Sequence, residues 1–127
     1  MEITFPGGVA VDACFDGFRV RTDQPKDHGG GSLAPAPFEL FLASLGTCAG
    51  LYALRFCQER KLPTDGLRLD LERTWDAGKN RLSRISLTIH LPAGFPGKYR
   101  SAIVRAANQC TVKRTILDPP EFDVIAV

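Results

Sequence analysis

The stretch PFELFLASLGTCAGLYALRFCQER, residues 37–60, decides how the rest of the chain can fold. It predicts one long helix, because Pro37 suits the first helical position, where its missing N–H costs nothing. A pair of cations and then Pro63 predict where the helix ends. Gly46 and Gly50 each cost about 1 kcal/mol relative to alanine inside a helix. Close approach of another backbone is the compensation that we expect first.

The same helix predicts a second copy of the chain. From Leu40 to Leu54 its residues are apolar or small nearly all round, which is more surface than one sheet face of a 127-residue monomer can cover. Gly46 and Gly50 are four residues apart, so a second helix could approach them along one face. We expect a homodimer whose two-fold interface buries well over about 2,000 Å², the range of obligate dimers.

The segment before this helix predicts strands and a loop. Residues 1–22 predict two short strands, with the turn Asp16-Gly17 between them. Residues 23–36 are rich in glycine, proline and polar side chains. A loop of that length is usually functional or mobile.

The segment after the helix predicts a hairpin and a second helix. Residues 67–75 and 85–91 alternate between apolar and polar side chains, which predicts an antiparallel hairpin with one apolar face. A second helix is expected from near Pro96 to just before Asp118, and residues 122–127 are expected to close the chain as a short strand. Strands, helix, hairpin, helix and strand in this order make an α+β fold of one domain.

Length and charge exclude several classes of protein. A chain of 127 residues is expected to form a single domain, and a net charge of +2 is too small for an electrostatic nucleic-acid binder. The sequence begins without a signal-peptide pattern. Its longest uncharged run, Leu40 to Leu54, is shorter than the roughly 18 residues of a membrane span. We expect a cytoplasmic protein that binds neither nucleic acid nor membrane.

Cysteines are the main candidates for chemistry. No two form a CxxC pair and the two histidines share no motif, so we expect no metal site and no structural disulfide. Small neighbours leave the Cys48 sulfur accessible to a small molecule or a second chain, although a buried inert thiol fits the pattern equally well. Cys57 lies about 13.5 Å further along the helix, on the opposite face, and is expected to be structural. Cys110 belongs to the apolar stripe of the second helix, where Lys113 and Arg114 could lower its pKa, or where it is simply a core residue.

Two segments carry a family resemblance. Residues 34–48, APAPFELFLASLGTC, resemble the first helix of the OsmC/Ohr family of osmotically inducible and organic hydroperoxide resistance proteins. Residues 108–114, NQCTVKR, are similar to the second cysteine segment of that family. The length and the order of elements agree, so the resemblance covers nearly the whole chain and is nearest to the OsmC-like branch. It implies the OsmC-like fold, with antiparallel sheets packed on two central helices in an intertwined homodimer.

The resemblance also implies a thiol peroxidase that needs no cofactor. Cys48 matches the peroxidatic cysteine, which a peroxide oxidises to a sulfenic acid, and Cys110 matches the resolving cysteine, which forms a disulfide with it. A cellular dithiol, either a lipoyl group or a small thiol, then reduces the disulfide. Organic hydroperoxides are the implied substrates. The apolar lining of the site that binds them is expected to come from Phe38, Phe41, Leu45 and Leu51.

Two positions depart from the family pattern. The family places a glutamate ten residues before the peroxidatic cysteine, where it holds an activating arginine, but this chain has Phe38 there and Glu39 one residue later. On a regular helix Glu39 points about 180° away from Cys48. With Ala36 as the cap, it would instead bond backbone N–H groups of the first turn. Thr111 replaces the proline that commonly follows the second cysteine.

A cation is still expected near Cys48, because a thiol this deep in a helix gains little from the dipole and keeps a pKa near about 8.5. The cation would have to come within about 4–6 Å of the sulfur. The strand before the helix offers Arg21, ranked first, and then Arg19, while the loop offers Lys26 and His28. A solvated strand face explains the two arginines equally well.

Two other functions fit the same residues. Because the family's glutamate is missing, the protein could sense redox state or exchange disulfides, with a Cys48–Cys110 disulfide but no rapid peroxide turnover. It could also be a module that binds a lipid-like molecule in an apolar cleft, with inert thiols.

Overall fold

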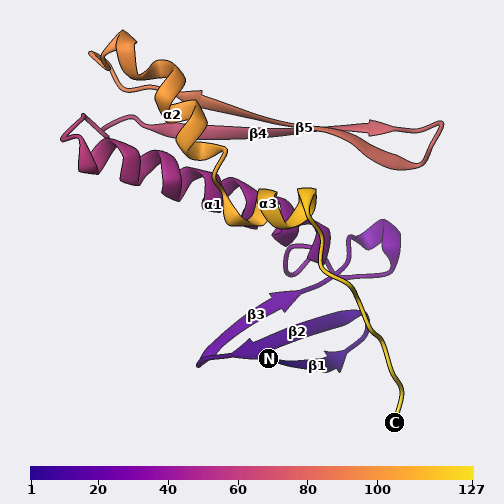
Figure 1. Ribbon diagram of the computed structural model, residues 1–127. Helices are drawn as coiled ribbons and strands as arrows, with labels where there is room; N and C mark the ends of the chain where they lie inside the picture. The colour runs from indigo at the N-terminus through magenta and orange to yellow at the C-terminus, as the bar shows by residue number, and fades with distance from the viewer. The chain divides into compact units, whose positions relative to one another are not determined.

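The computed structural model describes all of residues 1–127, which form two compact units, Met1–Ala43 and Ser44–Val127 (Figure 1). The first unit holds three strands, a loop and the start of a long helix. The second holds the rest of that helix, a hairpin and two shorter helices. The α+β class is therefore confirmed, and the single domain stays a prediction.

The first unit is built on a three-stranded antiparallel sheet. Its strands, in sheet order, are β1 (Glu2–Gly7), β2 (Ala10–Phe15) and β3 (Phe18–Thr22). Asp16 and Gly17 form the predicted turn with φ of 47° and 79°, as a two-residue hairpin turn requires. The prediction of two strands over residues 1–22 is wrong, because it missed β1. Pro6 is unfavourable inside a sheet, but an edge strand such as β1 tolerates it.

The loop after β3 is organised by one buried carboxylate. Asp23 accepts hydrogen bonds from the N–H groups of Gln24, Gly31 and Leu33 at 2.8, 2.9 and 3.0 Å. The bonds from Leu33, Gln24 and Gly31 hold the pKa of Asp23 below its ordinary value. A short 3₁₀ turn, η1 (Lys26–His28), lies within the loop. The segment is thus tied to its own strand rather than left without structure.

The long helix α1 (Pro37–Glu59) confirms the predicted helix to within one residue. The N–H of Ala36 donates to Glu39 Oε2 at 3.1 Å, so Glu39 caps the start of its own helix, as its position predicted. By length and composition alone, α1 could also cross a membrane, although its uncharged run is short. The core helix of a soluble protein meets the same criterion, and 33% of this apolar stretch is buried here.

The two glycines in the middle of α1 have no backbone packed against them within this chain. A Cβ on Gly46 would touch the Leu71 side chain at 3.6 Å, and a Cβ on Gly50 would meet nothing within 4 Å. The expected close approach of another backbone is therefore wrong for the single chain. Gly50 therefore lowers the stability of the helix, and no contact within the chain requires a glycine at this position.

The second unit packs a hairpin against helices. Strands β4 (Arg68–Asp76) and β5 (Arg81–His90) pair antiparallel, as predicted. Figure 1 shows α1 running alongside this hairpin. The apolar face of the hairpin packs against the buried side chains of α1 and α2 (Arg100–Ala107). The largest fully buried side chains in this core are Cys57, Ile103 and Cys110.

Two predictions for the end of the chain are wrong. The predicted second helix is broken: after the 3₁₀ turn η2 (Gly97–Tyr99), α2 ends at Ala107, and α3 (Thr111–Leu117) starts four residues later. Cys110, with φ −47° and ψ 121°, leaves the helical conformation and caps α3. The predicted strand over residues 122–127 is absent. These residues pair with no strand in the chain, and a strand needs a neighbouring edge for its backbone groups.

Candidate active site around Cys48 and Cys110

The two cysteines singled out by the sequence come together in the second unit. Cys48 lies in the middle of α1 and is half-buried, while Cys110 is fully buried at the start of α3. The Cys110 thiol donates toward the carbonyl oxygen of Leu45 at 3.8 Å and accepts the N–H of Lys113 at 3.5 Å. These bonds fix the Cys110 side chain between α1 and α3.

The Cys48 sulfur faces a set of hydrogen-bond donors at the start of α3. The Cys110 thiol lies within hydrogen-bonding reach of it, and so do the backbone N–H groups of Thr111 and Val112. All three donors come from consecutive residues, because the break after α2 turns this short segment toward α1. A sulfur in this position can be stabilised as a thiolate without a charged neighbour.

The pKa values of the two thiols move in opposite directions. Burial raises the pKa of Cys48, but the bonds from Val112, Cys110 and Thr111 outweigh it, and the net shift is downward. Burial raises the pKa of Cys110; the Lys113 N–H lowers it in part, and Cys48 raises it further. Cys48 is therefore the better thiolate of the pair. Cys110 has a single S–H, which points toward the Leu45 carbonyl in one orientation and donates to the Cys48 thiolate in the other.

Backbone N–H groups lower the pKa of Cys48, an effect for which the sequence analysis predicted a cation. The shift at Cys48 has no contribution from a lysine or arginine side chain. Arg21, Arg19, Lys26 and His28 all belong to the first unit. Their approach to Cys48 stays a prediction.

The structure gives two of these four side chains partners near them in sequence. Arg19 lies 3.6 Å from the buried carboxylate of Asp12 and also contacts the thiol of Cys14, its cross-strand neighbour. His28 Nδ1 lies 3.2 Å from Asp27 Oδ1 in the loop. Arg21 stands directly opposite Asp12 in the sheet. The sheet thus presents two arginines around one buried carboxylate.

Phe38 and Glu39 lie at the start of α1, also in the first unit. Phe38 stacks on Phe41, with ring centroids 5.6 Å apart. Glu39 bonds the N–H of Ala36. Neither contact involves an arginine, and a role for either residue at Cys48 stays a prediction.

Sequence reasoning missed the two N–H groups, because a backbone donor leaves no side-chain pattern to find. One signal was present. Thr111 occupies the first position of α3, and proline is favoured at that position of a helix. The family resemblance places a proline at residue 111. A proline there indicates that a separate helix starts at this position, with Cys110 as its cap.

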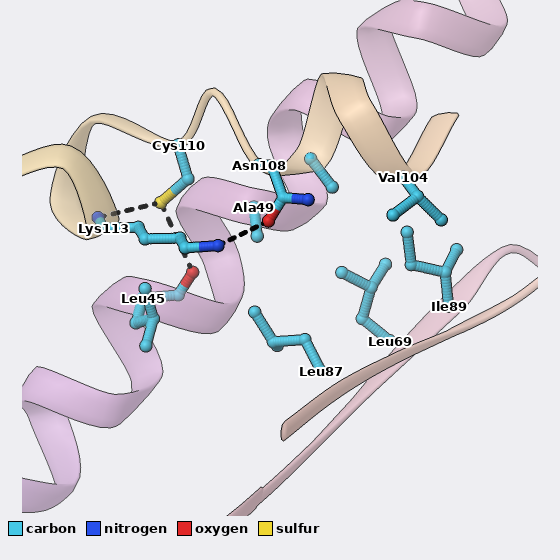
Figure 2. A pocket seen from close by; sticks show the side chains of 10 residues that line it. Leu45, Ala49, Leu69, Leu87, Ile89, Val104, Asn108, Cys110 and Lys113 are labelled. Carbon is cyan, nitrogen blue, oxygen red and sulfur yellow. Dashed lines mark hydrogen bonds between the residues drawn. The ribbon is translucent and has the colours of Figure 1, made fainter. Parts of the chain in front are cut away.

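An apolar cavity of 130 Å³ lies beside Cys110, between α1, the hairpin and α2 (Figure 2). Lys113 Nζ lies 2.5 Å from Asn108 Oδ1, and Figure 2 shows this polar pair beside the apolar side chains. Of the four residues expected to line a substrate site, only Leu45 lines this cavity; Leu51 is exposed. The other apolar walls come from Leu69, Leu87, Ile89 and Val104.

The two remaining cysteines lie outside this arrangement. Cys57 is fully buried, and burial raises the pKa of its thiol, in agreement with the structural role expected for it. Cys14 lies in β2 next to Arg19. No three side chains of His, Cys, Asp or Glu gather anywhere in the chain in a way that could hold a metal ion.

Comparison with known proteins assigns most of the chain to one family. The family model described as "OsmC-like protein" matches residues 29–125. No protein of curated function matches the sequence. The matched range includes both Cys48 and Cys110 and covers most of the chain.

Solved structures show the same fold at low sequence identity. A protein from Psychrobacter arcticus 273-4, named for osmotic stress induction and a detoxification response, has 20% identity and a TM-score of 0.77, over 90% of this chain and 85% of its own. An OsmC-like protein from Mycoplasma pneumoniae has 19% identity and a TM-score of 0.66, over 87% and 80%. An organic hydroperoxide resistance protein OsmC from Legionella pneumophila, also named a redox protein and regulator of sulfide bond formation, has 18% identity and a TM-score of 0.57, over 89% and 90%.

Proposed function

This chain belongs to the OsmC-like protein family, and from that premise we propose that it is a cysteine-based thiol peroxidase that reduces organic hydroperoxides. The observation that carries the proposal is the pairing of Cys48, whose pKa is lowered, with the buried Cys110 thiol and two N–H donors. Two observations support this chemistry. The family is redox-related, and in the pair of cysteines the pKa is lowered at Cys48 and raised at Cys110.

In the first step, the Cys48 thiolate attacks the outer oxygen of the hydroperoxide. An S–O bond forms, the O–O bond breaks, and the departing alkoxide takes up a proton to leave as the alcohol. Cys48 becomes a sulfenic acid and is oxidised by two electrons. The N–H groups of Thr111 and Val112 favour the thiolate that starts this step.

In the second step, the Cys110 sulfur attacks the Cys48 sulfenic acid. An S–S bond forms, and the hydroxyl of the sulfenic acid leaves with the Cys110 proton as water. A dithiol reductant, a lipoyl group or a small thiol, then returns both cysteines to thiols and is itself oxidised to a disulfide. No metal or organic cofactor enters these steps.

The apolar cavity beside Cys110 supports an organic substrate over hydrogen peroxide. Its walls are leucine, isoleucine, valine and alanine side chains, and Cys110, Lys113 and Asn108 add the polar groups, while Cys48 lies outside the lining. Transfer of an alkyl or aryl group from water to such walls lowers the free energy of binding, whereas hydrogen peroxide has no apolar group to bury.

A homodimer in the cytoplasm completes the proposal. Much of the apolar surface of this chain has no cover of its own, including Leu51 on α1 and the tail over residues 122–127. By length and composition, α1 is apolar enough to cross a membrane. A second copy that covers its exposed side chains would account for this apolar composition in a member of this family.

A redox-regulating or disulfide-exchanging protein is the second candidate. Glu39 caps its own helix instead of holding an arginine, which favours weaker peroxide turnover. The Legionella relative is named a regulator of sulfide bond formation as well as a hydroperoxide resistance protein.

Consumption of cumene hydroperoxide and of hydrogen peroxide, with a dithiol as reductant, tests the proposal. We expect faster turnover of cumene hydroperoxide, and complete loss in Cys48→Ser. In Cys110→Ser, one oxidation of Cys48 per chain should persist while steady turnover falls. A wild-type chain that forms the Cys48–Cys110 disulfide but shows no turnover would favour the second candidate, and an unreactive Cys48 would contradict both.

A further inference from the structure

Tyr52 connects α1 to the segment that faces Cys48. It lies four residues after Cys48, so both side chains project from the same face of the helix. Its hydroxyl oxygen is 3.2 Å from Thr111 Oγ1, a hydrogen bond between residues 59 apart in the sequence. Thr111 is the first residue of α3 and supplies one of the N–H groups that reach the Cys48 sulfur.

Few polar contacts hold α3 in this position, and Val112 adds an apolar contact with the core. The helix is seven residues long, none of them fully buried, and an irregular segment separates it from α2. Besides the bonds of the Cys110 thiol, its side-chain ties to neighbouring elements are those of Lys113 to Asn108 and Thr111 to Tyr52. Of these two, only the Tyr52 bond joins α3 to the helix that carries Cys48.

We propose that Tyr52 is a positioning residue for Cys48: its hydroxyl, bonded to Thr111, holds the start of α3 where the backbone donors face the sulfur. The inference rests on the proposed function, because it assigns Tyr52 to the same thiol. Loss of the hydroxyl would let the start of α3 move away from α1. Thr111 and Val112 would then stabilise the thiolate less.

The pH dependence of Cys48 alkylation by iodoacetamide tests this role, with Cys48 followed separately from the other three cysteines by mass spectrometry of its peptide. In Tyr52→Phe we expect alkylation at pH 7 to slow by about threefold to tenfold, the range that corresponds to the loss of one ordinary hydrogen bond. Above about pH 10, where the thiol is ionised in either protein, the rates should converge. An incidental surface bond would leave the whole profile unchanged.

Thr111→Val removes the same bond from the other partner and keeps the Thr111 N–H. It should shift the profile as Tyr52→Phe does, and it carries the test if Tyr52→Phe fails to fold. The double variant should be no slower than either single variant, because both remove one interaction. Profiles that match the wild type in both single variants, or losses that simply add, would overturn the proposal.

Tyr99→Phe is the matched control. Tyr99 is the only other tyrosine, and its ring packs edge-on against Phe56 with centroids 6.0 Å apart. Removing its hydroxyl should leave the Cys48 profile in place. Alkylation needs no peroxide, so a chain that is inert to hydroperoxides but shifts its profile in Tyr52→Phe would contradict the proposed function alone.

Discussion

The Cys110 thiol is one of three donors that reach the Cys48 sulfur, and it lowers the pKa of Cys48 together with Val112 and Thr111. In Cys110→Ala the thiolate loses that donor, and the pKa of Cys48 should rise toward its ordinary value. Since only the thiolate reacts, the alkylation rate of Cys48 at pH 7 should fall by about threefold to tenfold. Titration of the rate from pH 5 to pH 10 measures this: the rise should move to higher pH. An unmoved profile would mean that the backbone donors alone set the pKa.

Thr111 contributes both an N–H and a hydroxyl, and two substitutions separate them. Thr111→Pro removes both, while the proline ring suits the first position of α3 and should keep the helix. Thr111→Val removes the hydroxyl only. We expect Cys48 alkylation at neutral pH to be about threefold slower in Thr111→Pro than in Thr111→Val, which measures the N–H contribution. Equal rates would show that the Thr111 N–H does not act on the sulfur.

The first turn of α1 tests which of two roles Glu39 has. Its carboxylate accepts the Ala36 N–H at 3.1 Å, so Glu39→Ala should lower the free energy of unfolding by about 0.5–1 kcal/mol. The pH profile of Cys48 should stay as in the wild type, because the bond is local to the helix start. Denaturant unfolding and the alkylation assay give the two readouts. A shifted profile with unchanged stability would instead indicate a role at the thiol.

Elements whose ends carry strong local signals could be predicted from the sequence. Pro37 and Pro63 bracket α1, and the alternation of residues 67–75 and 85–91 marks β4 and β5. The break before α3 could not be predicted in this way, because Cys110 is an unusual cap and belongs to the apolar stripe of the predicted helix. The pairing of Cys48 with Cys110 was foreseen only through the family resemblance. The N–H donors depend on that break and were missed with it.

At the scale of the whole molecule, the sequence predicted a dimer from surface that the single chain cannot cover. The exposed tail over residues 122–127 is rich in apolar and β-branched residues, as a strand is, but pairs with no strand of the chain. The proposed homodimer would cover both this tail and the exposed apolar residues of α1.

A substitution at Gly50 distinguishes an effect on the stability of the single chain from an effect on its dimerisation. A Cβ at this position meets nothing within 4 Å in the single chain, so Gly50→Ala should stabilise α1 by about 1 kcal/mol through helix propensity. If a second copy packs on the glycine, the same methyl group must weaken the dimer. We expect light scattering to show dissociation at higher concentration than in the wild type, and the melting temperature to depend less steeply on concentration, because a weaker dimer gains less stability from mass action. Gly46→Ala is the matched control, because its Cβ would contact Leu71 at 3.6 Å within the chain. A Gly50→Ala protein that is more stable and equally dimeric would place the interface elsewhere, and a wild-type monomer at micromolar concentration would contradict the dimer itself.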